Sequence, residues 1–358
     1  MSTSNDSFNF IQRPPVSPNH DFWRITIDTN PEDCNLKCIM CEEHSPYSDF
    51  IPTLYRTTGV KRRRMPNQWL AQIFEQAAAL GVREIIPSTM GEPLLYRGFE
   101  EIFKLSHQTG IKINLTTNGT FPKKSVMEWA LLIVPNTTDV KISWNGATAA
   151  TAAAVMHKID FASCVDNVRR FVAVRDRVYA DTGYYCRVTF QLTFMENNMH
   201  ELADIVRLAA SLGVDRVKGH QLWAHFAETK ELDFRRSVES VRRWNNYVTQ
   251  AHAAAREVRR PNGEPVLLEN ITPLKEAAGG RVPEHYDCPF LGRELWVSAT
   301  GKYSPCCAPD ELRQRLGDFG NFQDRSVADV LASAAYRNLL MNYKSHDLCK
   351  TCTMRRPA

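Results

Sequence analysis

Three cysteines with three and two residues between them could hold a metal cluster. Cys34, Cys38 and Cys41 lie in the stretch CNLKCIMC, shortly after the apolar run WRITID. Four thiolates would complete a zinc site or an iron–sulfur site, whereas three leave one coordination position for another molecule. A loop with this spacing can reach three corners of a cubane and leave the fourth iron open. A zinc site would need another ligand nearby, and His44 is the close candidate.

A second set of cysteines lies near the C-terminus. Cys288 and Cys306 flank the segment ELWVSATGKYSP, which predicts a β-hairpin, and Cys349 and Cys352 form a Cys-x2-Cys pair. Four thiolates in this arrangement make a closed site for zinc or for an iron–sulfur cluster. In a reducing compartment, clustered thiols indicate metal binding rather than disulfides.

The composition is that of a globular chain. Its 358 residues are 43% hydrophobic, enough for one large core and a smaller module, and the net charge is +4.

The basic run at 61–64 lacks interleaved aromatic residues, so we expect that it forms a solvated loop and binds no nucleic acid. The alternative is that this run binds an acidic group of the substrate. We find no signal peptide and no run of about 18 apolar residues, and we expect a soluble, cytoplasmic protein without a membrane partner. The isolated Cys164 and Cys186 are interpreted as buried small hydrophobic residues.

Six apolar, β-branched segments alternate with segments of helical periodicity, several of which end at a glycine. This order predicts an α/β fold with a parallel sheet and outer helices, either a curved partial barrel or an open doubly wound sheet. Ligands bind at the carboxyl ends of the strands in both cases. The predicted strands are 23–28, 83–88, 111–117, 139–144, 187–194 and 215–220, and the predicted helices are 67–81, 99–110, 161–174 and 200–213.

The pattern divides the chain into four segments. We predict an N-terminal tail at 1–20, a partial barrel at 21–220, a helical and charged bridge at 221–285, and a cysteine-rich module at 286–358. The three-cysteine loop leaves the carboxyl end of the first strand, where a barrel binds its ligands.

With this loop after its first strand, the sequence resembles the radical S-adenosylmethionine superfamily over roughly residues 21–220. The resemblance implies a partial (β/α)6 barrel and a [4Fe–4S] cluster held by Cys34, Cys38 and Cys41. In that family the open iron binds the amino and carboxylate groups of S-adenosylmethionine, and one-electron reduction cleaves this cofactor to a 5′-deoxyadenosyl radical.

The segment STMGEP, residues 88–93, resembles the Gly-Gly-Glu-Pro segment of the family. This implies that Glu92 holds the ammonium group of the cofactor and that Gly91 lets the backbone approach it. Met90 replaces the first glycine, which changes the detailed backbone geometry. Without the cysteines, a turn into the next helix would be the simpler interpretation of Gly-Glu-Pro.

Two segments with Asn-Gly, TTNGT at 116–120 and SWNG at 143–146, resemble segments that line the adenosine in the family. This implies contacts from Asn118, and from Ser143 and Asn145 to the ribose hydroxyls. Met40 stands where the family often has an aromatic residue beside the adenine. Asn-Gly is also a common turn dipeptide, so a turn is the alternative at each position.

The C-terminal cysteines resemble the auxiliary-cluster module called twitch, a shortened relative of the SPASM module. This implies a second [4Fe–4S] cluster held by Cys288, Cys306, Cys349 and Cys352. The further cysteines of a full SPASM module are missing, so we expect one auxiliary cluster. Cys307 adjoins Cys306, and either sulfur could be the ligand while the other is packed or chemically active.

Two clusters without a GxGxxG or Walker sequence favour radical oxidation that needs no flavin or nicotinamide. We expect dehydrogenation of a sugar-like or aminocyclitol alcohol, driven by a flavodoxin- or ferredoxin-type electron donor. The alternative in this class is an epimerase of a sugar or ribosomal peptide with Cys307 as hydrogen-atom donor, and the alternative outside it is a non-catalytic, zinc-stabilised binding protein. Lys218, His220 and Gln221 could bind substrate near the barrel mouth.

Overall fold

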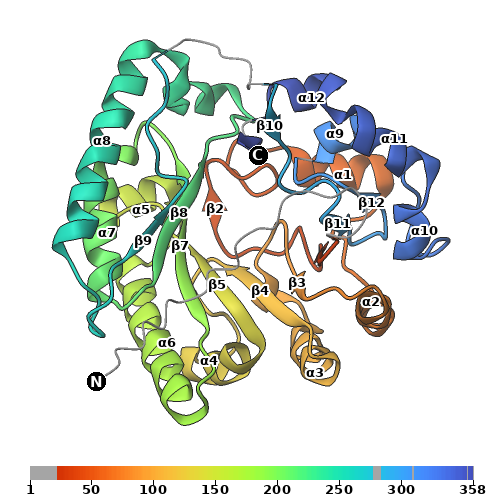
Figure 1. The fold of residues 1–358 in the computed structure, drawn as a ribbon, viewed down its shortest axis with the longest axis horizontal. Helices are drawn as coiled ribbons and strands as arrows, with labels where there is room; N and C mark the ends of the chain where they lie inside the picture. The colour runs from red at the N-terminus through yellow and green to blue at the C-terminus, as the bar shows by residue number, and fades with distance from the viewer. Residues whose placement is uncertain (1–21, 277–283, 309, 353, 358) are drawn as a thin grey trace, which may run out of the picture.

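A computed structural model describes residues 22–276, 284–308, 310–352 and 354–357, so the predicted N-terminal tail at 1–20 lies outside the described residues. Its centre is a curved sheet with the strand order β12-β11-β1-β3-β4-β5-β7-β8-β9 (Figure 1). Neighbouring strands from β11 to β9 run parallel, which confirms the predicted α/β fold with a partial barrel. The strands of the barrel are β1 (Arg24–Ile27), β3 (Glu84–Ile86), β4 (Lys112–Thr117), β5 (Thr137–Ser143), β7 (Arg187–Phe194) and β8 (Arg216–Gln221), followed by β9 (Leu267–Glu269).

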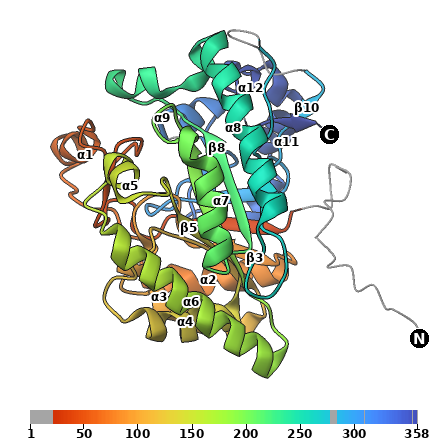
Figure 2. The same cartoon turned by 90° about the vertical axis from the view of Figure 1, so that its left-hand side faces the viewer.

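Helices cover the outer side of this sheet (Figures 1 and 2). All four predicted helices are present, and α3 ends as predicted, because Gly110 adopts a φ of 75° and its N–H bonds to Ser106 O. The helices before the C-terminal module are α1 (Phe50–Thr58), α2 (Asn67–Ala79), α3 (Phe99–Thr109), α4 (Val126–Ile133), α5 (Ala149–Val155), α6 (Phe161–Thr182), α7 (Leu202–Ser211) and α8 (Val238–Glu257).

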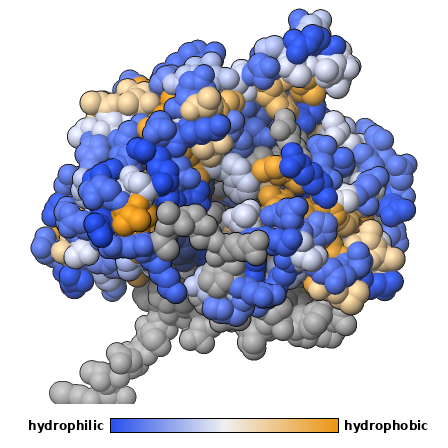
Figure 3. Space-filling view, turned by 90° about the horizontal axis from the view of Figure 1, so that it is seen from above, coloured by the Kyte–Doolittle hydropathy of each residue, from blue (hydrophilic) through white to orange (hydrophobic). Residues whose placement is uncertain are grey.

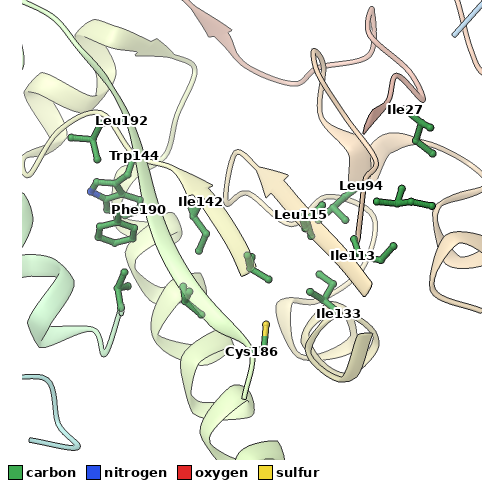
Figure 4. Close-up of a cluster of buried hydrophobic side chains, with 14 of the residues drawn as sticks. Ile27, Leu94, Ile113, Leu115, Ile133, Ile142, Trp144, Cys186, Phe190 and Leu192 are labelled. Atoms are coloured by element: carbon green, nitrogen blue, oxygen red, sulfur yellow. The ribbon is translucent and has the colours of Figure 1, made fainter. Parts of the chain in front are cut away.

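The outer face of the sheet is apolar and forms the core with these helices. Ile142 and Phe190 are fully buried, and the Phe190 ring stacks on Trp144 with centroids 4.4 Å apart. Figure 4 shows these side chains with Cys186, which belongs to the same core. Cys186 is 0% exposed and Cys164 is 1% exposed, which confirms both as buried small residues. Full burial of one large apolar side chain stabilises a fold by about 1.5–3 kcal/mol.

The inner face of the same strands is polar, because alternate residues of a strand point to opposite faces. At the amino ends, Arg24 Nε donates to Glu294 Oε2 over 2.8 Å, and Arg24 Nη1 lies 3.4 Å from Glu84 Oε1. Across the sheet, Arg216 pairs with Asp139. These ion pairs fill the amino-terminal end of the barrel, so the site loops are left to the carboxyl end.

The C-terminal segment continues the same sheet. β11 (Glu294–Val297) pairs with β1 from Arg24↔Glu294 to Ile27↔Val297, and β12 (Tyr303–Ser304) returns antiparallel, which confirms the predicted hairpin. The boundary predicted at 286 stays a prediction, but β11 and β9 both extend the barrel sheet. The remaining elements are β10 (Tyr286–Asp287), α9 (Asp310–Arg313), α10 (Val327–Leu331), α11 (Ala334–Asn342), α12 (Asp347–Lys350) and β13 (Arg356–Pro357).

One face of the molecule is mostly hydrophilic, with hydrophobic side chains in small separate groups (Figure 3). Within the described ranges, no helix combines the length and the apolar character that crossing a bilayer requires.

Candidate functional site

The loop after β1 brings Cys34, Cys38 and Cys41 together. Cys38 lies in the short strand β2 (Lys37–Cys38), which pairs antiparallel with β6 (Met156–His157) and sets Cys38 opposite Met156. Ile39 packs with Met156 in a small apolar cluster that Cys34 and Cys38 also contact. Packing on this cluster and pairing with β6 therefore hold the loop in place.

The surroundings of the three sulfurs suit thiolate ligands of an iron–sulfur cluster. Burial raises the pKa of Cys34 to about 11 and that of Cys41 to about 12. Burial also raises the pKa of Cys38, and the charges of Cys41 and Cys34 raise it further, so the three sulfurs are neighbours. His44 N lies 3.4 Å from Cys41 Sγ, and such N–H contacts stabilise a thiolate. Three buried thiols in one loop match the donor set of a [4Fe–4S] cluster with one open iron.

His44 makes a hydrogen bond within this loop. Its Nε2 lies 2.7 Å from Pro31 O, and burial lowers the pKa of His44. Among the residues that the structure describes, no group of three or more His, Cys, Asp or Glu side chains is placed to hold a single metal ion, so His44 and the three cysteines do not form a mononuclear zinc site. His44 therefore forms a hydrogen bond with Pro31 O and is not positioned as a fourth zinc ligand.

The loop at 88–93 packs directly on the turn that precedes Cys34. Gly91 has a φ of 74°, and a Cβ there would lie 2.5 Å from Asn30 O. Asp28, which follows β1, accepts a hydrogen bond from Thr89 N over 3.1 Å. Only glycine permits both the left-handed backbone and this close approach. Gly91 is thus required by loop packing, and its contact with a cofactor stays a prediction.

Glu92 joins the 88–93 loop to the end of β4. Its Oε1 accepts from Thr117 Oγ1 over 2.8 Å and from Leu94 N over 3.2 Å, and its Oε2 accepts from Asn118 N over 2.7 Å. Burial raises the pKa of Glu92 to about 7, although these donors lower it. A carboxylate has about four acceptor positions, so three donors leave one free, and a contact of Glu92 with an ammonium group stays a prediction. Asn118 Nδ2 lies 4.0 Å from Cys34 Sγ, which brings this loop to the cysteines.

The remaining predicted cofactor residues lie on loops of the same barrel edge. Ser143 ends β5 and is partly exposed. Asn145 is 2% exposed, and its Oδ1 accepts from Thr193 N over 2.9 Å, so this amide also holds β5 and β7 together. Met40 packs on the apolar cluster that contains Ile39. Contacts of Met40, Ser143 and Asn145 with adenosine stay predictions.

The four predicted C-terminal ligands converge. Burial raises the pKa of Cys349 to about 12, and three neighbouring thiol charges raise it further, those of Cys306, Cys288 and Cys352. Leu291 N lies 3.4 Å from Cys288 Sγ. Cys307 belongs to the same group, because its hydrogen bond to Cys306 raises its pKa and the charges of neighbouring thiols raise it further, those of Cys306, Cys352 and Cys288. Four thiolates would complete a closed tetrathiolate site, and which four of these five bind a cluster stays a prediction.

Cys306 and Cys307 differ in their surroundings. A hydrogen bond between the two side chains lowers the pKa of Cys306 and raises that of Cys307. Ala308 N lies 3.4 Å from Cys306 Sγ, the same distance as the N–H contact at Cys288. In the described part of the chain, no backbone N–H donor to Cys307 Sγ is found. Cys306 therefore has the environment of a ligand, and Cys307 lies directly beside it.

A pocket with both polar and apolar side chains links the barrel to the C-terminal hairpin, and the sequence analysis missed it. Asp28 Oδ2 lies 3.8 Å from Arg313 Nη2, and the charge of Arg313 lowers the pKa of Cys306. Thr89 Oγ1 is buried without a hydrogen-bond partner in the described residues. The position of Asp28 at the carboxyl end of the first strand was the available signal. The pocket is lined by Asp28, Arg63, Thr89, Trp296, Ser298, Lys302, Ser304, Arg313 and Gln314, among others.

The basic run at 61–64 is tied to the cysteine loop. Arg63 pairs with Glu32, and its side chain is only 14% exposed. Arg64 Nε donates to Asp33 Oδ2 over 2.8 Å. The expectation of a solvated loop is therefore wrong for Arg63, because the carboxylates before Cys34 attract these guanidinium groups.

Two of the three residues predicted near the barrel mouth face its interior. Lys218 Nζ lies 3.4 Å from Glu269 Oε1, and burial lowers the pKa of Lys218 to about 8. His220 is exposed, and its Nδ1 lies 3.3 Å from Gln191 Nε2 of the neighbouring strand β7. Alternation along β8 turns Gln221 to the other face, so it is not part of this group.

Comparison with known proteins agrees with this geometry. Streptococcus suis SuiB bound to S-adenosylmethionine has a similar fold, with a TM-score of 0.62 and 19% identity over 93% of this chain and 72% of SuiB. The protein anSMEcpe with bound S-adenosylmethionine has a TM-score of 0.60 and 15% identity over 93% of this chain and 85% of anSMEcpe. No curated protein sequence matches the chain significantly.

Two family patterns match the sequence itself. The pattern of the iron–sulfur cluster-binding domain SPASM matches residues 288–353, which include the four converging cysteines. The pattern of the Radical SAM superfamily matches residues 31–209, half of the chain. The protein is therefore an enzyme that uses S-adenosylmethionine and iron–sulfur clusters, and it belongs to the radical S-adenosylmethionine superfamily with a C-terminal SPASM/twitch module.

Proposed function

We propose that this enzyme removes a hydrogen atom from a carbon of a small hydroxylated substrate, a sugar or an aminocyclitol, and oxidises the alcohol to a carbonyl group. Cys34, Cys38 and Cys41 would hold the first [4Fe–4S] cluster, and Cys288, Cys306, Cys349 and Cys352 would hold the auxiliary one. The first cluster with S-adenosylmethionine supplies the hydrogen-abstracting radical, and the auxiliary cluster accepts an electron.

The polar groups in the pocket beside Asp28 are the observation that supports this substrate class. Asp28, Thr89 and Ser304 offer acceptors and hydroxyl groups, and Lys302 and Arg313 offer donors. The buried Thr89 Oγ1 has no hydrogen-bond partner among the described residues, and a substrate hydroxyl could supply one. A polyol would thus satisfy groups that an apolar ligand would leave unpaired.

The position of this pocket supports oxidation. Its lining includes Thr89 of the loop that packs on the cysteine turn and Ser304 of the hairpin that leads to Cys306. An alcohol that loses a hydrogen atom must also lose one electron and one proton to become a carbonyl compound. Ser304 in the lining accepts a hydrogen bond from Cys306 N over 3.3 Å, so the pocket adjoins the predicted electron acceptor.

A peptide substrate is the second candidate. SuiB was solved bound to the precursor peptide SuiA, and anSMEcpe with the Cp18Cys peptide. Cys307 could then donate a hydrogen atom to a substrate radical, as epimerisation requires. Its side chain bonds to Cys306, so this thiol lies beside the auxiliary site, and for this reason we rank oxidation first. All ten cysteines are free thiols, which supports a cytoplasmic location.

The test is turnover in deuterated water by anaerobically reconstituted enzyme, with titanium(III) citrate as reductant and a panel of sugars, aminocyclitols and peptides. We expect a product two hydrogens lighter than the substrate and one 5′-deoxyadenosine per product, formed equally by wild type and Cys307→Ala. A product of unchanged constitution that contains solvent deuterium, and that Cys307→Ala does not form, would replace oxidation by epimerisation.

A further inference from the structure

We propose that a basic surface beside Cys34 is the docking site of an acidic electron-donor protein of the flavodoxin or ferredoxin type. This proposal rests on the proposed function, because it concerns the electron that the first cluster needs. We define the basic surface by four residues: Arg62, Arg64, Arg97 and Lys123.

The four cations come from three separate segments and line one pocket. The first two precede α2, Arg97 precedes α3, and Lys123 follows β4. All four residues are exposed, and the side chain of Arg62 is 61% exposed. The fold thus concentrates positive charge that is scattered along the sequence.

Nearby carboxylates do not balance this charge. The pocket contains two acids, Glu32 and Asp33. Glu32 is paired with Arg63, and Asp33 is paired with both Arg62 and Arg64, so a single carboxylate is shared among the four cations. Burial lowers the pKa of Lys123, and the charges of Arg97 and Arg64 lower it further although Asp33 raises it. Like charges thus repel one another here, and an acidic partner would relieve this repulsion.

Cys34 lines the same pocket as the four cations. A donor protein seated on the basic surface would therefore lie next to a predicted ligand of the first cluster. In the transfer, one electron leaves the reduced donor, which is oxidised, and enters the iron–sulfur cluster, which is reduced. Electron-transfer complexes have small, transient interfaces, and complementary charges on the two proteins speed their encounter. An exposed patch of four cations suits an interface of this kind.

The decisive measurement is direct binding of a flavodoxin to the reconstituted enzyme by calorimetry, at low and at high salt. The test variant is Arg62→Glu/Arg97→Glu. The matched control is Arg177→Glu/Arg337→Glu, with the same change in net charge on exposed residues of α6 and α11. We expect binding by the test variant to be weaker by about tenfold or more at low salt, with the difference reduced at high salt, and the control to bind like wild type. Equal binding by both variants would overturn the proposal.

A second readout separates this inference from the proposed function. For each variant, formation of 5′-deoxyadenosine is measured with reduced flavodoxin and with titanium(III) citrate, and the ratio of the two rates is compared. We expect the ratio to fall only in Arg62→Glu/Arg97→Glu. A loss of both rates together would instead assign the surface to an acidic substrate and overturn the proposal. No activity of wild type with titanium(III) citrate would contradict the proposed function, while the binding result would still test the surface.

Discussion

Backbone N–H groups contact three of the seven predicted ligand sulfurs. Cys41, Cys288 and Cys306 each have an N–H group 3.4 Å from the sulfur, whereas Cys164 and Cys186 are buried among apolar side chains. Such N–H donors stabilise a thiolate, and iron binding then releases the proton of each buried thiol.

Replacement of Cys34, Cys38 and Cys41 together by Ala should remove one cluster and all cleavage of S-adenosylmethionine, because these thiols are its predicted protein ligands. Iron and sulfide analysis should show a loss of about four irons, the content of one [4Fe–4S] cluster. Cys164→Ala is the control for loss of a buried thiol and should keep both clusters. Unchanged formation of 5′-deoxyadenosine by the triple variant would refute the ligand assignment.

Cys306→Ala and Cys307→Ala should differ in iron content. The N–H contact from Ala308 prepares Cys306 as the ligand, so its removal should release the auxiliary cluster while the first cluster remains. Cys307→Ala should retain both clusters. Iron analysis and the visible spectrum of the two reconstituted variants check this, and the opposite pattern would make Cys307 the ligand.

At the scale of elements, the site depends on how loops at the carboxyl ends of three strands pack on one another. Gly91 packs against the turn after β1, and Glu92 binds backbone and side-chain groups at the end of β4. Each loop is short and anchored by a parallel strand, so the sheet sets the spacing of the site.

Gly91→Ala should disrupt the site more than a comparable change at Gly110. Both glycines have a φ near 75°, so both alanines carry left-handed backbone strain of about 1–2 kcal/mol. Gly110 has open space around the new Cβ, whereas at Gly91 the Cβ would lie 2.5 Å from Asn30 O. We expect Gly110→Ala to keep S-adenosylmethionine binding and Gly91→Ala to lose most of it while remaining folded, as calorimetry and circular dichroism would show. Equal affinity in the two variants would mean that the loops adjust without consequence.

At the scale of the molecule, barrel and C-terminal module share one sheet. β11 lies beside β1, and the buried Glu294 binds both Arg24 and Thr26. A module attached through a central strand pair cannot unfold without exposing the barrel edge.

Glu294→Ala should therefore destabilise the whole protein. It leaves the partly buried Arg24 with the more distant carboxylate of Glu84, 3.4 Å away. Removing one partner of a fully buried ion pair costs about 3–5 kcal/mol, and this value is the upper bound here because Glu84 remains. Glu101→Ala, which removes an exposed ion pair with Lys104, is the control and should change the unfolding free energy by less than about 1 kcal/mol. Chemical unfolding followed by fluorescence should give one transition in each protein. A separate early transition in Glu294→Ala would show that the module unfolds independently.

The sequence by itself determined the six barrel strands, four of the helices around them, the two cysteine sets and the hairpin between Cys288 and Cys306. These features are local, because hydrophobic period, turn residues and ligand spacing are set by neighbours in the chain. Only the tertiary structure decided that β11 extends the barrel sheet, that Arg313 reaches Asp28 and that cations from three segments surround Cys34. Pairing between distant segments depends on the register and packing of the whole sheet, which no local pattern records.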